Sequence, residues 1–251
     1  MPVNALVGSA HARGITTLTL DSPANRNALS AALVGELRAA LAAAGADPAV
    51  RAVVLTHTGG TFCAGADLKS PCDPADFLAL LREILALPKP VVARTTGHVR
   101  AGGLGLLGAC DIAAGGPDST YAFTETHLGL APAVISGPLL PRLDPRAAAR
   151  YFLTAEPFGP AEATRIGLLT LHGDTDDKDL TTALEPVLDG LRKAGPAALA
   201  ETKRLVTAPV RAVLDRDGEA LTALSAQVFA SEEAREGITA RFERRNPAWA
   251  Q

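Results

Sequence analysis

Segments with strand-like and helix-like patterns alternate along the first 172 residues of this chain, and only helix-like segments follow. Short aliphatic and β-branched runs predict strands over residues 15–20, 52–56, 91–93, 111–114, 121–123 and 168–171. Apolar spacing and capping residues predict helices over residues 31–44, 74–87, 102–109, 145–151, 160–166, 180–193, 196–206, 218–231 and 232–245. This order favours an α/β core followed by a helical C-terminal part.

Composition and charge argue against several classes of protein. The formal net charge is −3 and no long basic run occurs, which argues against nucleic-acid binding. Hydrophobic residues make up 47% of the chain, yet no run of about 18 apolar residues predicts a membrane span. No signal-peptide pattern opens the chain and the three cysteines form no C-x-x-C pair, so we expect a reduced, cytosolic protein. The histidines lack ligand spacing, so we expect no metal site.

Two bends rich in glycine and alanine are the strongest functional signal. The first is Phe-Cys-Ala-Gly-Ala-Asp-Leu-Lys at residues 62–69, and the second is Arg-Ala-Gly-Gly-Leu-Gly-Leu-Leu-Gly-Ala-Cys-Asp at residues 100–111. Only backbone can approach a ligand closely at such bends, and the second bend opens a helix-like run whose first N–H groups lack partners. One N–H from each bend could hold a developing oxyanion. The alternative is that both are ordinary tight turns.

Residues 103–108 also satisfy the dinucleotide-binding pattern G-x-G-x-x-G. That pattern is informative when it closes the first strand of a βαβ unit at the start of a domain. Here it lies in the middle of the chain, and no clear first strand of that kind precedes it. We therefore do not expect a nucleotide cofactor.

With these bends, the chain resembles the enoyl-CoA hydratase/isomerase (crotonase) superfamily. The resemblance also covers Asp-Ser-Pro-Ala-Asn-Arg-Asn-Ala-Leu at residues 21–29 and Glu-Gly-Ile-Thr-Ala-Arg-Phe-Glu-Arg-Arg at residues 236–245, so it spans most of the chain. It implies an α/β fold of the ClpP/crotonase type, in which repeated ββα turns form a right-handed spiral, with a helical C-terminal trimerisation region. We therefore expect a spiral core over residues 1–190 and a helical region over residues 191–251, assembled as a homotrimer or as a hexamer of two trimers.

The resemblance assigns roles to three residues at the reaction centre. The backbone N–H groups of Ala66 and Gly102 match the oxyanion hole that holds a thioester carbonyl, and Glu125 matches the second catalytic glutamate of the hydratases. A carboxyl group in apolar surroundings can act as acid or base near neutral pH. From the sequence alone, an exposed or helix-capping Glu125 would be the simpler interpretation. The first glutamate of the two-glutamate hydratases is missing, because Gly105 stands at its position.

For CoA binding, the resemblance points to residues near both ends of the chain and after the first bend. The matching residues are Arg26, Ala28, Asp67, Leu68, Phe242 and Arg245. The segment around Arg26 suits the nucleotide end, and the last two residues often come from a neighbouring subunit in the family. A solvated helix face is the alternative for Arg245. CoA arrives as part of the substrate, so no separate cofactor is expected.

These features predict a hydro-lyase of the enoyl-CoA hydratase type, which adds water across the 2,3 double bond of an acyl-CoA thioester. Glycine in place of the first glutamate also occurs in a bacterial branch that includes methylglutaconyl-CoA hydratases of leucine breakdown, which makes that a candidate subtype. One alternative is an enoyl-CoA isomerase with Glu125 as its sole base. Another is an acyl-CoA-binding protein with impaired catalysis, an alternative that Gly105 motivates. His98 and His127 have no assigned role.

Overall fold

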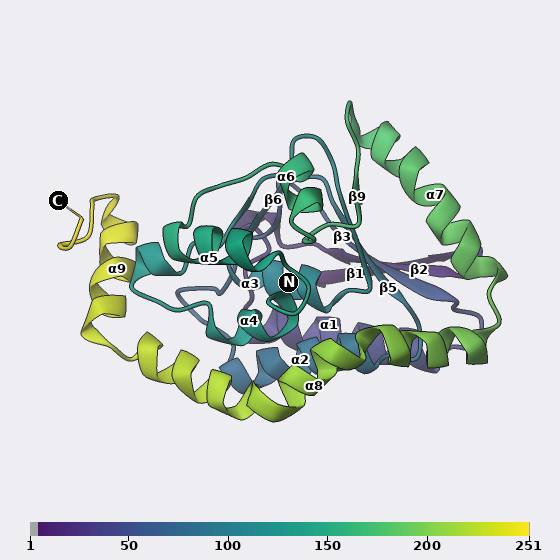
Figure 1. Ribbon diagram of the computed structural model, residues 1–251, viewed down its shortest axis with the longest axis horizontal. Coiled ribbons are helices and arrows are strands. Elements are labelled where there is room, and N and C mark those ends of the chain that lie inside the picture. Colours follow the sequence, from purple (N-terminus) through teal and green to yellow (C-terminus); the bar gives the residue numbers. More distant parts are fainter. Residues whose placement is uncertain (1–4, 251) are drawn as a thin grey trace.

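The computed structural model describes residues 5–250, except for the side chain of Asp177. The main sheet has six strands in the order β1-β2-β3-β5-β7-β9 (Figure 1). These strands are β1 (Val7–Ala12), β2 (Ile15–Leu20), β3 (Ala52–His57), β5 (Val91–Thr95), β7 (Ile112–Gly115) and β9 (Leu171–His172). β1 and β2 form an antiparallel hairpin, and each later strand pairs in parallel with the strand before it, so the sheet grows at one edge along the chain.

The helices fill the connections and form the C-terminal part. They are α1 (Ala31–Ala46), α2 (Pro74–Ala86), α3 (Gly102–Ala109), α4 (Ala133–Leu139), α5 (Pro145–Thr154), α6 (Pro160–Arg165), α7 (Asp177–Lys193), α8 (Pro196–Phe229) and α9 (Glu232–Glu243), with 3-10 turns η1 (Pro23–Asn25) and η2 (Thr126–Leu128). Figure 1 shows α8 running alongside α2 and α4, with α9 at the far end of the molecule.

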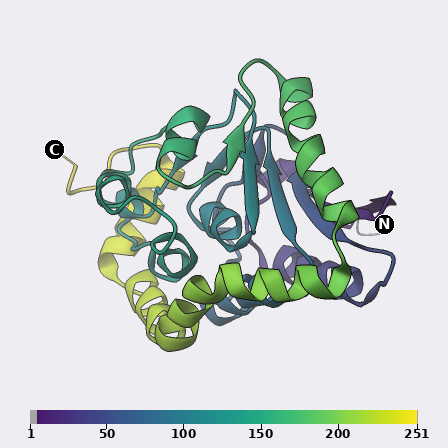
Figure 2. The same cartoon turned by 45° about the vertical axis from the view of Figure 1, so that its right-hand side comes forward.

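The central strands β3, β5 and β7 of the main sheet are buried on both faces. Successive residues of a strand point to opposite sides, so each of these strands contributes to two separate cores. On one face Val54 and Val92 pack with Leu180 of α7, which lies beside the sheet in Figure 2. On the other face Leu55 and Val91 belong to the main core. A parallel sheet covered on both sides explains the unbroken aliphatic runs of the sequence.

A second sheet of three short parallel strands carries the functional bends. Its strands are β4 (Thr61–Cys63), β6 (His98–Arg100) and β8 (Tyr121–Ala122), in the order β4-β6-β8. Each strand ends two or three residues before a predicted reaction-centre residue, namely Ala66, Gly102 or Glu125. Because parallel strands end at the same edge of a sheet, these three residues come together although they are far apart in the sequence.

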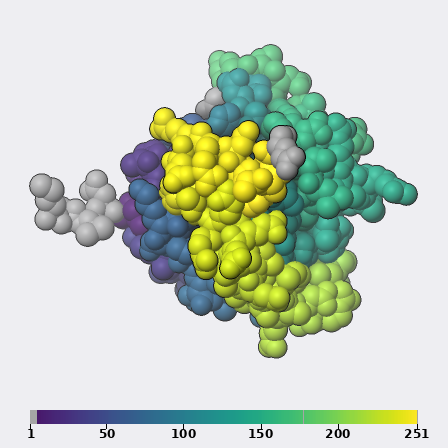
Figure 3. Space-filling view, turned by 90° about the vertical axis from the view of Figure 1, so that its left-hand side faces the viewer, coloured from purple at the N-terminus to yellow at the C-terminus, as the bar shows by residue number. Residues whose placement is uncertain are grey.

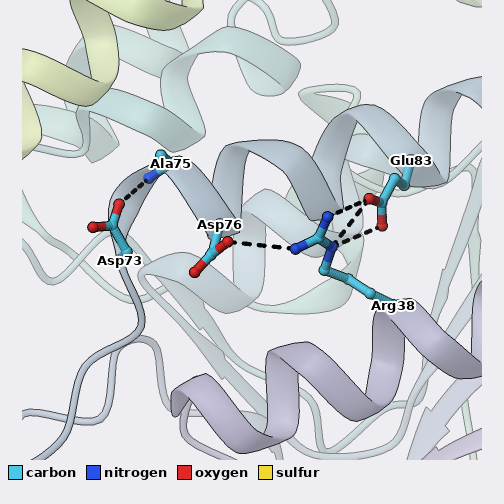
Figure 4. A network of polar contacts seen from close by, with 5 residues as sticks. All are labelled: Arg38, Asp73, Ala75, Asp76 and Glu83. Atoms are coloured by element: carbon cyan, nitrogen blue, oxygen red, sulfur yellow. Dashed lines mark hydrogen bonds and ion pairs between the residues drawn. The ribbon is translucent and has the colours of Figure 1, made fainter.

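A charged cluster joins α1 to α2 (Figure 4). Arg38 of α1 donates from Nη2 to Glu83 Oε1 at 2.7 Å and from Nη1 to Asp76 Oδ1 at 3.4 Å. Asp73 caps α2 by accepting a hydrogen bond from the Ala75 N–H at 2.7 Å. These contacts fix the position of α2, which carries Phe77 into the core.

Helix α8 is one helix of 34 residues, where the sequence predicted two. The expected break between residues 206 and 218 contains Pro209, which has no N–H to donate to the helix. Buried residues nevertheless continue through it at helical spacing, with Thr207, Val210 and Leu214 all facing inward. The prediction of two helices is wrong because tertiary packing overrides the local preference of the sequence.

The other differences concern short elements. β1, β4, β6 and α4 were not expected, and β9 covers only residues 171–172 of the strand predicted over 168–171. β4 and β6 have three residues each, too few to reveal a period. α4 contains Gly137 and Pro138, which hide its helical character in the sequence. These elements form because they pair or pack with neighbouring strands and helices.

The C-terminal part continues from the core without a clear break. The expected boundary after residue 190 falls inside α7, which ends at Lys193, and α8 begins at Pro196. The division into two regions therefore stays a prediction. Within the described residues, no helix is long and apolar enough to cross a membrane.

Candidate active site

One cavity of about 1140 Å³ collects the residues that the sequence singled out. It is lined by the loop before α1, the two glycine-rich bends, the segment after β8, the end of α8 and α9. All nine predicted site residues line it, namely Arg26, Ala28, Ala66, Asp67, Leu68, Gly102, Glu125, Phe242 and Arg245. Residues separated by more than 200 positions in the sequence thus share one surface.

Over residues 5–250, the first bend leaves the Ala66 N–H free of protein partners. Leu29 donates its N–H to Gly65 O at 2.8 Å and accepts from Asp67 N at 3.3 Å. In a parallel bridge of this kind the residue between the two bonded ones, Ala66, directs its own N–H to the other side. Within the described residues no acceptor takes that N–H, and Ala66 is exposed in the cavity.

The second bend touches the first. A Cβ placed on Gly65 would lie 2.7 Å from Ala101 Cβ and 3.4 Å from Gly102 N, so only glycine fits there. Ala101 has the strained values φ 47° and ψ −122°, which turn the chain from β6 into α3. Gly102 is the first residue of α3, and among the described residues no protein acceptor takes its N–H. Two unpaired amides therefore lie on adjoining bends of one cavity.

Glu125 supplies a buried carboxyl group to the same cavity. Its side chain belongs to a residue only 8% exposed, and Oε2 has no hydrogen-bond partner among the described residues. Burial, which disfavours the charged form, raises the pKa of Glu125 to about 7. A carboxyl group with this pKa can both accept and donate a proton near neutral pH.

The position of the missing first glutamate is closed by packing. A Cβ on Gly105 would lie 2.7 Å from Ile135 Cγ2 and 3.2 Å from Phe77 Cζ. Any side chain at Gly105 would therefore displace Ile135 or Phe77. The apolar groups at this place exclude a second carboxyl from the site as it stands. Sequence reasoning found Gly105 and missed the two residues that occupy its space.

The loop before α1 is shaped by Asn27, which the sequence analysis did not single out. Asn27 is fully buried, and its side chain donates to Thr61 O at 2.8 Å and accepts from Ser22 N at 2.7 Å. This holds Arg26 exposed at the cavity, in a left-handed conformation with φ 59°. An asparagine in the turn segment that opens with Ser-Pro at residues 22–23 was the signal for such a bracing role.

The carboxylate of Asp67 accepts hydrogen bonds that hold the first bend together. Its Oδ1 accepts from Lys69 N at 3.0 Å and from Ser70 N at 3.3 Å, and its Oδ2 accepts from Asn25 Nδ2 at 3.3 Å. The carboxylate therefore ties the first bend to η1. Leu68 follows it and lines the cavity, as does Ala28.

Helix α9 and the residues that follow it bring Phe242 and Arg245 to the cavity from the same chain. No neighbouring subunit is needed to place them there. Arg245 pairs with Glu236 at 2.6 Å and with Glu243 at 2.6 Å, so its guanidinium is shared by two carboxylates. Phe242 is 52% exposed and is free to cover a ligand.

The two histidines without an assigned role line the cavity as well, and both are exposed. His98 Nδ1 lies 2.8 Å from Thr120 Oγ1, a hydroxyl that also accepts from Arg100 Nη2 at 2.7 Å. The guanidinium of Arg100, a residue that the sequence analysis did not single out, is thereby held against Thr120. Within the described residues, no group of three or more His, Cys, Asp or Glu side chains could hold a metal ion.

Together, the growing parallel sheet, the small sheet beside it and the helical C-terminal region define the crotonase fold. A sequence model described as enoyl-CoA hydratase/isomerase matches residues 10–251. The chain therefore belongs to the enoyl-CoA hydratase/isomerase family.

Individual relatives resemble the chain along nearly all of its length. Enoyl-CoA hydratase EchA19 of Mycobacterium tuberculosis is 33% identical, over 94% of this chain and 93% of that protein. The crystal structure of an enoyl-CoA hydratase from Mycobacterium avium is 48% identical, with a TM-score of 0.91, over 98% of this chain and 100% of that one. A carnitinyl-CoA hydratase from Mycobacterium avium is 25% identical, with a TM-score of 0.86, over 99% of each chain.

Proposed function

We propose that this protein is an enoyl-CoA hydratase, which adds water across the 2,3 double bond of an acyl-CoA thioester. The observation that carries the proposal is the meeting, in one cavity, of two unpaired amides and a buried carboxyl group with a pKa of about 7. The names of the relatives, which are enoyl-CoA hydratases, support the same reaction.

In this proposal Glu125 acts first as a base and then as an acid. The ionised carboxylate accepts a proton from water while the water oxygen bonds to C3 of the substrate. The π electrons of the C2–C3 bond move toward the thioester carbonyl and give an enolate. Protonated Glu125 then transfers the proton to C2, which restores the thioester and completes the addition of water.

The amides of Ala66 and Gly102 would donate to the enolate oxygen. Negative charge on this oxygen grows as the enolate forms, so these bonds stabilise the transition state more than the bound substrate. In studied enzymes the loss of one such donor costs about 2.7–4 kcal/mol. The CoA part would lie along Arg26, Ala28, Asp67 and Leu68, with Phe242 of α9 and Arg245 just beyond this helix near it.

The acyl group is best accommodated by the helical side of the cavity. Every lining residue that α2, α4 and α8 contribute is uncharged: Pro74, Phe77, Ala133, Val134, Ile135, Ser225, Ala226 and Phe229. This wall offers no cation to a second carboxylate, such as the one in a methylglutaconyl group. We therefore favour an uncharged, apolar acyl chain over the methylglutaconyl subtype.

An enoyl-CoA isomerase is the second candidate, and the packing at Gly105 favours it. With Ile135 and Phe77 in the place of a second carboxyl group, no other acid is available there to orient water. A single base is sufficient to move a proton from C2 to C4 of a 3-enoyl thioester, and apolar surroundings suit that transfer. The same amides would hold the enolate.

One substrate panel separates these functions. The purified protein is incubated with 2-enoyl-CoA thioesters of increasing chain length and with methylglutaconyl-CoA, and loss of the conjugated thioester absorbance is followed. We expect hydration of apolar chains and much slower reaction of methylglutaconyl-CoA. Conversion of a 3-enoyl-CoA without any hydration of 2-enoyl-CoA would support the isomerase instead. Tight acyl-CoA binding with no turnover, unchanged in Glu125→Gln, would indicate a binding protein.

The assembly as a trimer or hexamer and the cytosolic location remain predictions. Light scattering on the eluate of a size-exclusion column would measure the mass of the assembly. A monomer would contradict the expected trimer. It would leave the reaction centre itself in place, because the nine predicted site residues belong to one chain.

A further inference from the structure

The turn that carries Glu125 is interlocked with the C-terminal helix. A Cβ on Gly237 of α9 would lie 2.4 Å from the backbone oxygen of Leu128, and a Cβ on Gly129 would lie 2.6 Å from the backbone oxygen of Glu233. A backbone carbonyl group of the other segment therefore packs directly against each glycine. Both glycines are buried. The backbones of η2 and α9 can approach this closely because neither Gly129 nor Gly237 has a side chain.

The interlock lies one turn away from the reactive carboxyl group. Glu125 precedes η2, and its backbone oxygen accepts from Leu128 N at 2.8 Å and from Leu130 N at 3.0 Å. Leu128 and Gly129, which contact α9, therefore lie inside the hydrogen-bonded loop that Glu125 closes. A shift of α9 toward this loop would move the backbone of Glu125 and uncover its side chain.

We propose that α9 holds Glu125 in its reactive position, with Gly129 and Gly237 as positioning residues. The proposal rests on the proposed role of Glu125 as the acid/base. Among the described residues, none bonds to Oε2 of Glu125 to anchor its side chain, so the position of the side chain depends on the backbone of the turn. The opposite end of α9 supplies Arg241 and Phe242 to the cavity. Figure 3 shows this C-terminal segment covering one face of the molecule, between the N-terminal and central parts of the chain.

Helix α9 therefore connects two parts of the site. A CoA thioester that contacts Phe242 would press on the same helix that braces the Glu125 turn. The ion pair between Arg245 and Glu236 holds the chain end against α9. Glu236 also accepts a hydrogen bond from Ala248 N at 2.8 Å, which folds the residues after α9 back onto the helix. Bound substrate and an aligned carboxyl group would thus favour each other.

The first test is Gly237→Ala in the full-length protein, with Gly35→Ala as its control. Both glycines lie within helices, but a Cβ on Gly35 would have no neighbour within 4 Å. We expect kcat of Gly237→Ala to fall roughly 10- to 100-fold, as for a misplaced catalytic group, with a much smaller change in KM. Gly35→Ala should match the wild type. Unchanged kcat in Gly237→Ala would overturn the proposal.

The second readout does not depend on turnover. The carboxyl stretch of Glu125, isolated as the infrared difference from Glu125→Gln, is titrated in the ligand-free protein. We expect the midpoint to fall in Gly237→Ala, because the displaced turn admits water to the carboxylate. A lowered midpoint in an enzyme that hydrates no 2-enoyl-CoA would refute the proposed function and keep the positioning role. An unaltered midpoint together with normal kcat would refute the positioning role.

A second pair of variants covers the case in which Gly237→Ala does not fold. Gly129→Asn pushes on α9 from the other side, and asparagine tolerates the φ of 67° at this position. Its control is Gly14→Asn in the β1–β2 turn, where φ is 78° and the nearest atom to a Cβ is Arg51 Cγ at 3.3 Å. The same fall in kcat and in the infrared midpoint is expected for Gly129→Asn alone. Equal behaviour of the two variants would contradict the proposal.

Discussion

At the scale of single residues, the proposed chemistry depends most on Glu125. Sequence reasoning found it through its match to a family motif, and the residue pattern alone favoured an exposed glutamate. Burial is what changes that interpretation, since Oε2 has no partner in the part of the chain that the structure describes and burial raises the pKa of Glu125 to about 7. The depth of a side chain depends on residues from distant parts of the chain, so local sequence could not reveal it.

The first prediction concerns Glu125→Gln. The amide keeps the size of the side chain and cannot move a proton, so turnover should fall by roughly 10²–10⁴-fold while acyl-CoA binding persists. The measurements are kcat with a 2-enoyl-CoA and a titration with a saturated acyl-CoA. In the wild type, kcat/KM should rise with pH through about 7, because the carboxylate is the form that accepts the proton from water. Full activity of the variant would refute the role of Glu125.

The same pKa has a consequence for stability. The folded protein holds the Glu125 proton up to about pH 7, whereas the unfolded chain releases it near the ordinary value of 4.5. The contribution of Glu125 to stability is therefore complete below about pH 4.5 and is lost as the pH rises through 7. Glu125→Gln should remove this loss, so the variant should gain stability over the wild type above pH 7. Urea unfolding at several pH values measures the difference.

At the scale of elements, a buried ion pair fastens α8 to the core. Lys203 Nζ lies 2.9 Å from Asp111 Oδ2 and donates to the backbone oxygens of Ile84 at 2.7 Å and Lys89 at 3.0 Å. Burial lowers the pKa of Lys203 and raises that of Asp111, so desolvation outweighs their mutual attraction. The ion pair therefore determines the position at which α8 packs on the core, and it adds little net stability compared with an apolar contact of the same size.

The second prediction is that Lys203→Met destabilises the protein by about 3–5 kcal/mol, because the buried Asp111 carboxylate loses the ammonium group that contacts it and keeps only the attraction of Arg142. The control is Arg204→Met on the adjacent residue, whose 67%-exposed side chain pairs only with Glu201 within the described residues. That change should cost well under 1 kcal/mol. Chemical denaturation measures both variants, and similar stabilities of the two would be evidence against the assigned role of the pair.

The elements also show where sequence patterns succeed. Helices were expected from residues 31 and 74, and the residues just before them, Ser30 and Asp73, accept hydrogen bonds at the starts of α1 and α2. The long strands of the main sheet agree with their aliphatic runs. The three-residue strands β4 and β6 were missed although they position two residues of the predicted reaction centre, because only their neighbours in the sheet stabilise them. The break expected between residues 206 and 218 is absent for a related reason, because packing against the core continues α8 through this segment.

At the scale of the whole molecule, charge is distributed unevenly. The chain carries a formal net charge of −3, yet the cavity is lined by Arg26, Lys69, Arg100, Arg241 and Arg245, against the two carboxyl groups of Asp67 and Glu125. An anionic ligand is therefore attracted to the cavity, although the net charge of the whole protein is negative.

The third prediction is that KM for an acyl-CoA rises several-fold between low and high salt, because added ions screen this attraction. The comparison substrate is the corresponding acyl-pantetheine, which has no nucleotide phosphates and should show a much weaker dependence. Initial rates at several sodium chloride concentrations give both values. Equal salt dependence of the two substrates would show that the cavity does not recognise the phosphates.

The order of the main sheet has a consequence for the way the molecule is made. Because each parallel strand joins the edge left by the preceding one, a chain emerging from the ribosome can add its strands in the order of synthesis. The two bends and Glu125 are already present in the first half of the chain. The brace on Glu125 is in α9, so a nascent chain holds all three reaction-centre residues well before it gains the helix that fixes the carboxyl group. Activity should therefore appear last, after most of the native sheet has formed.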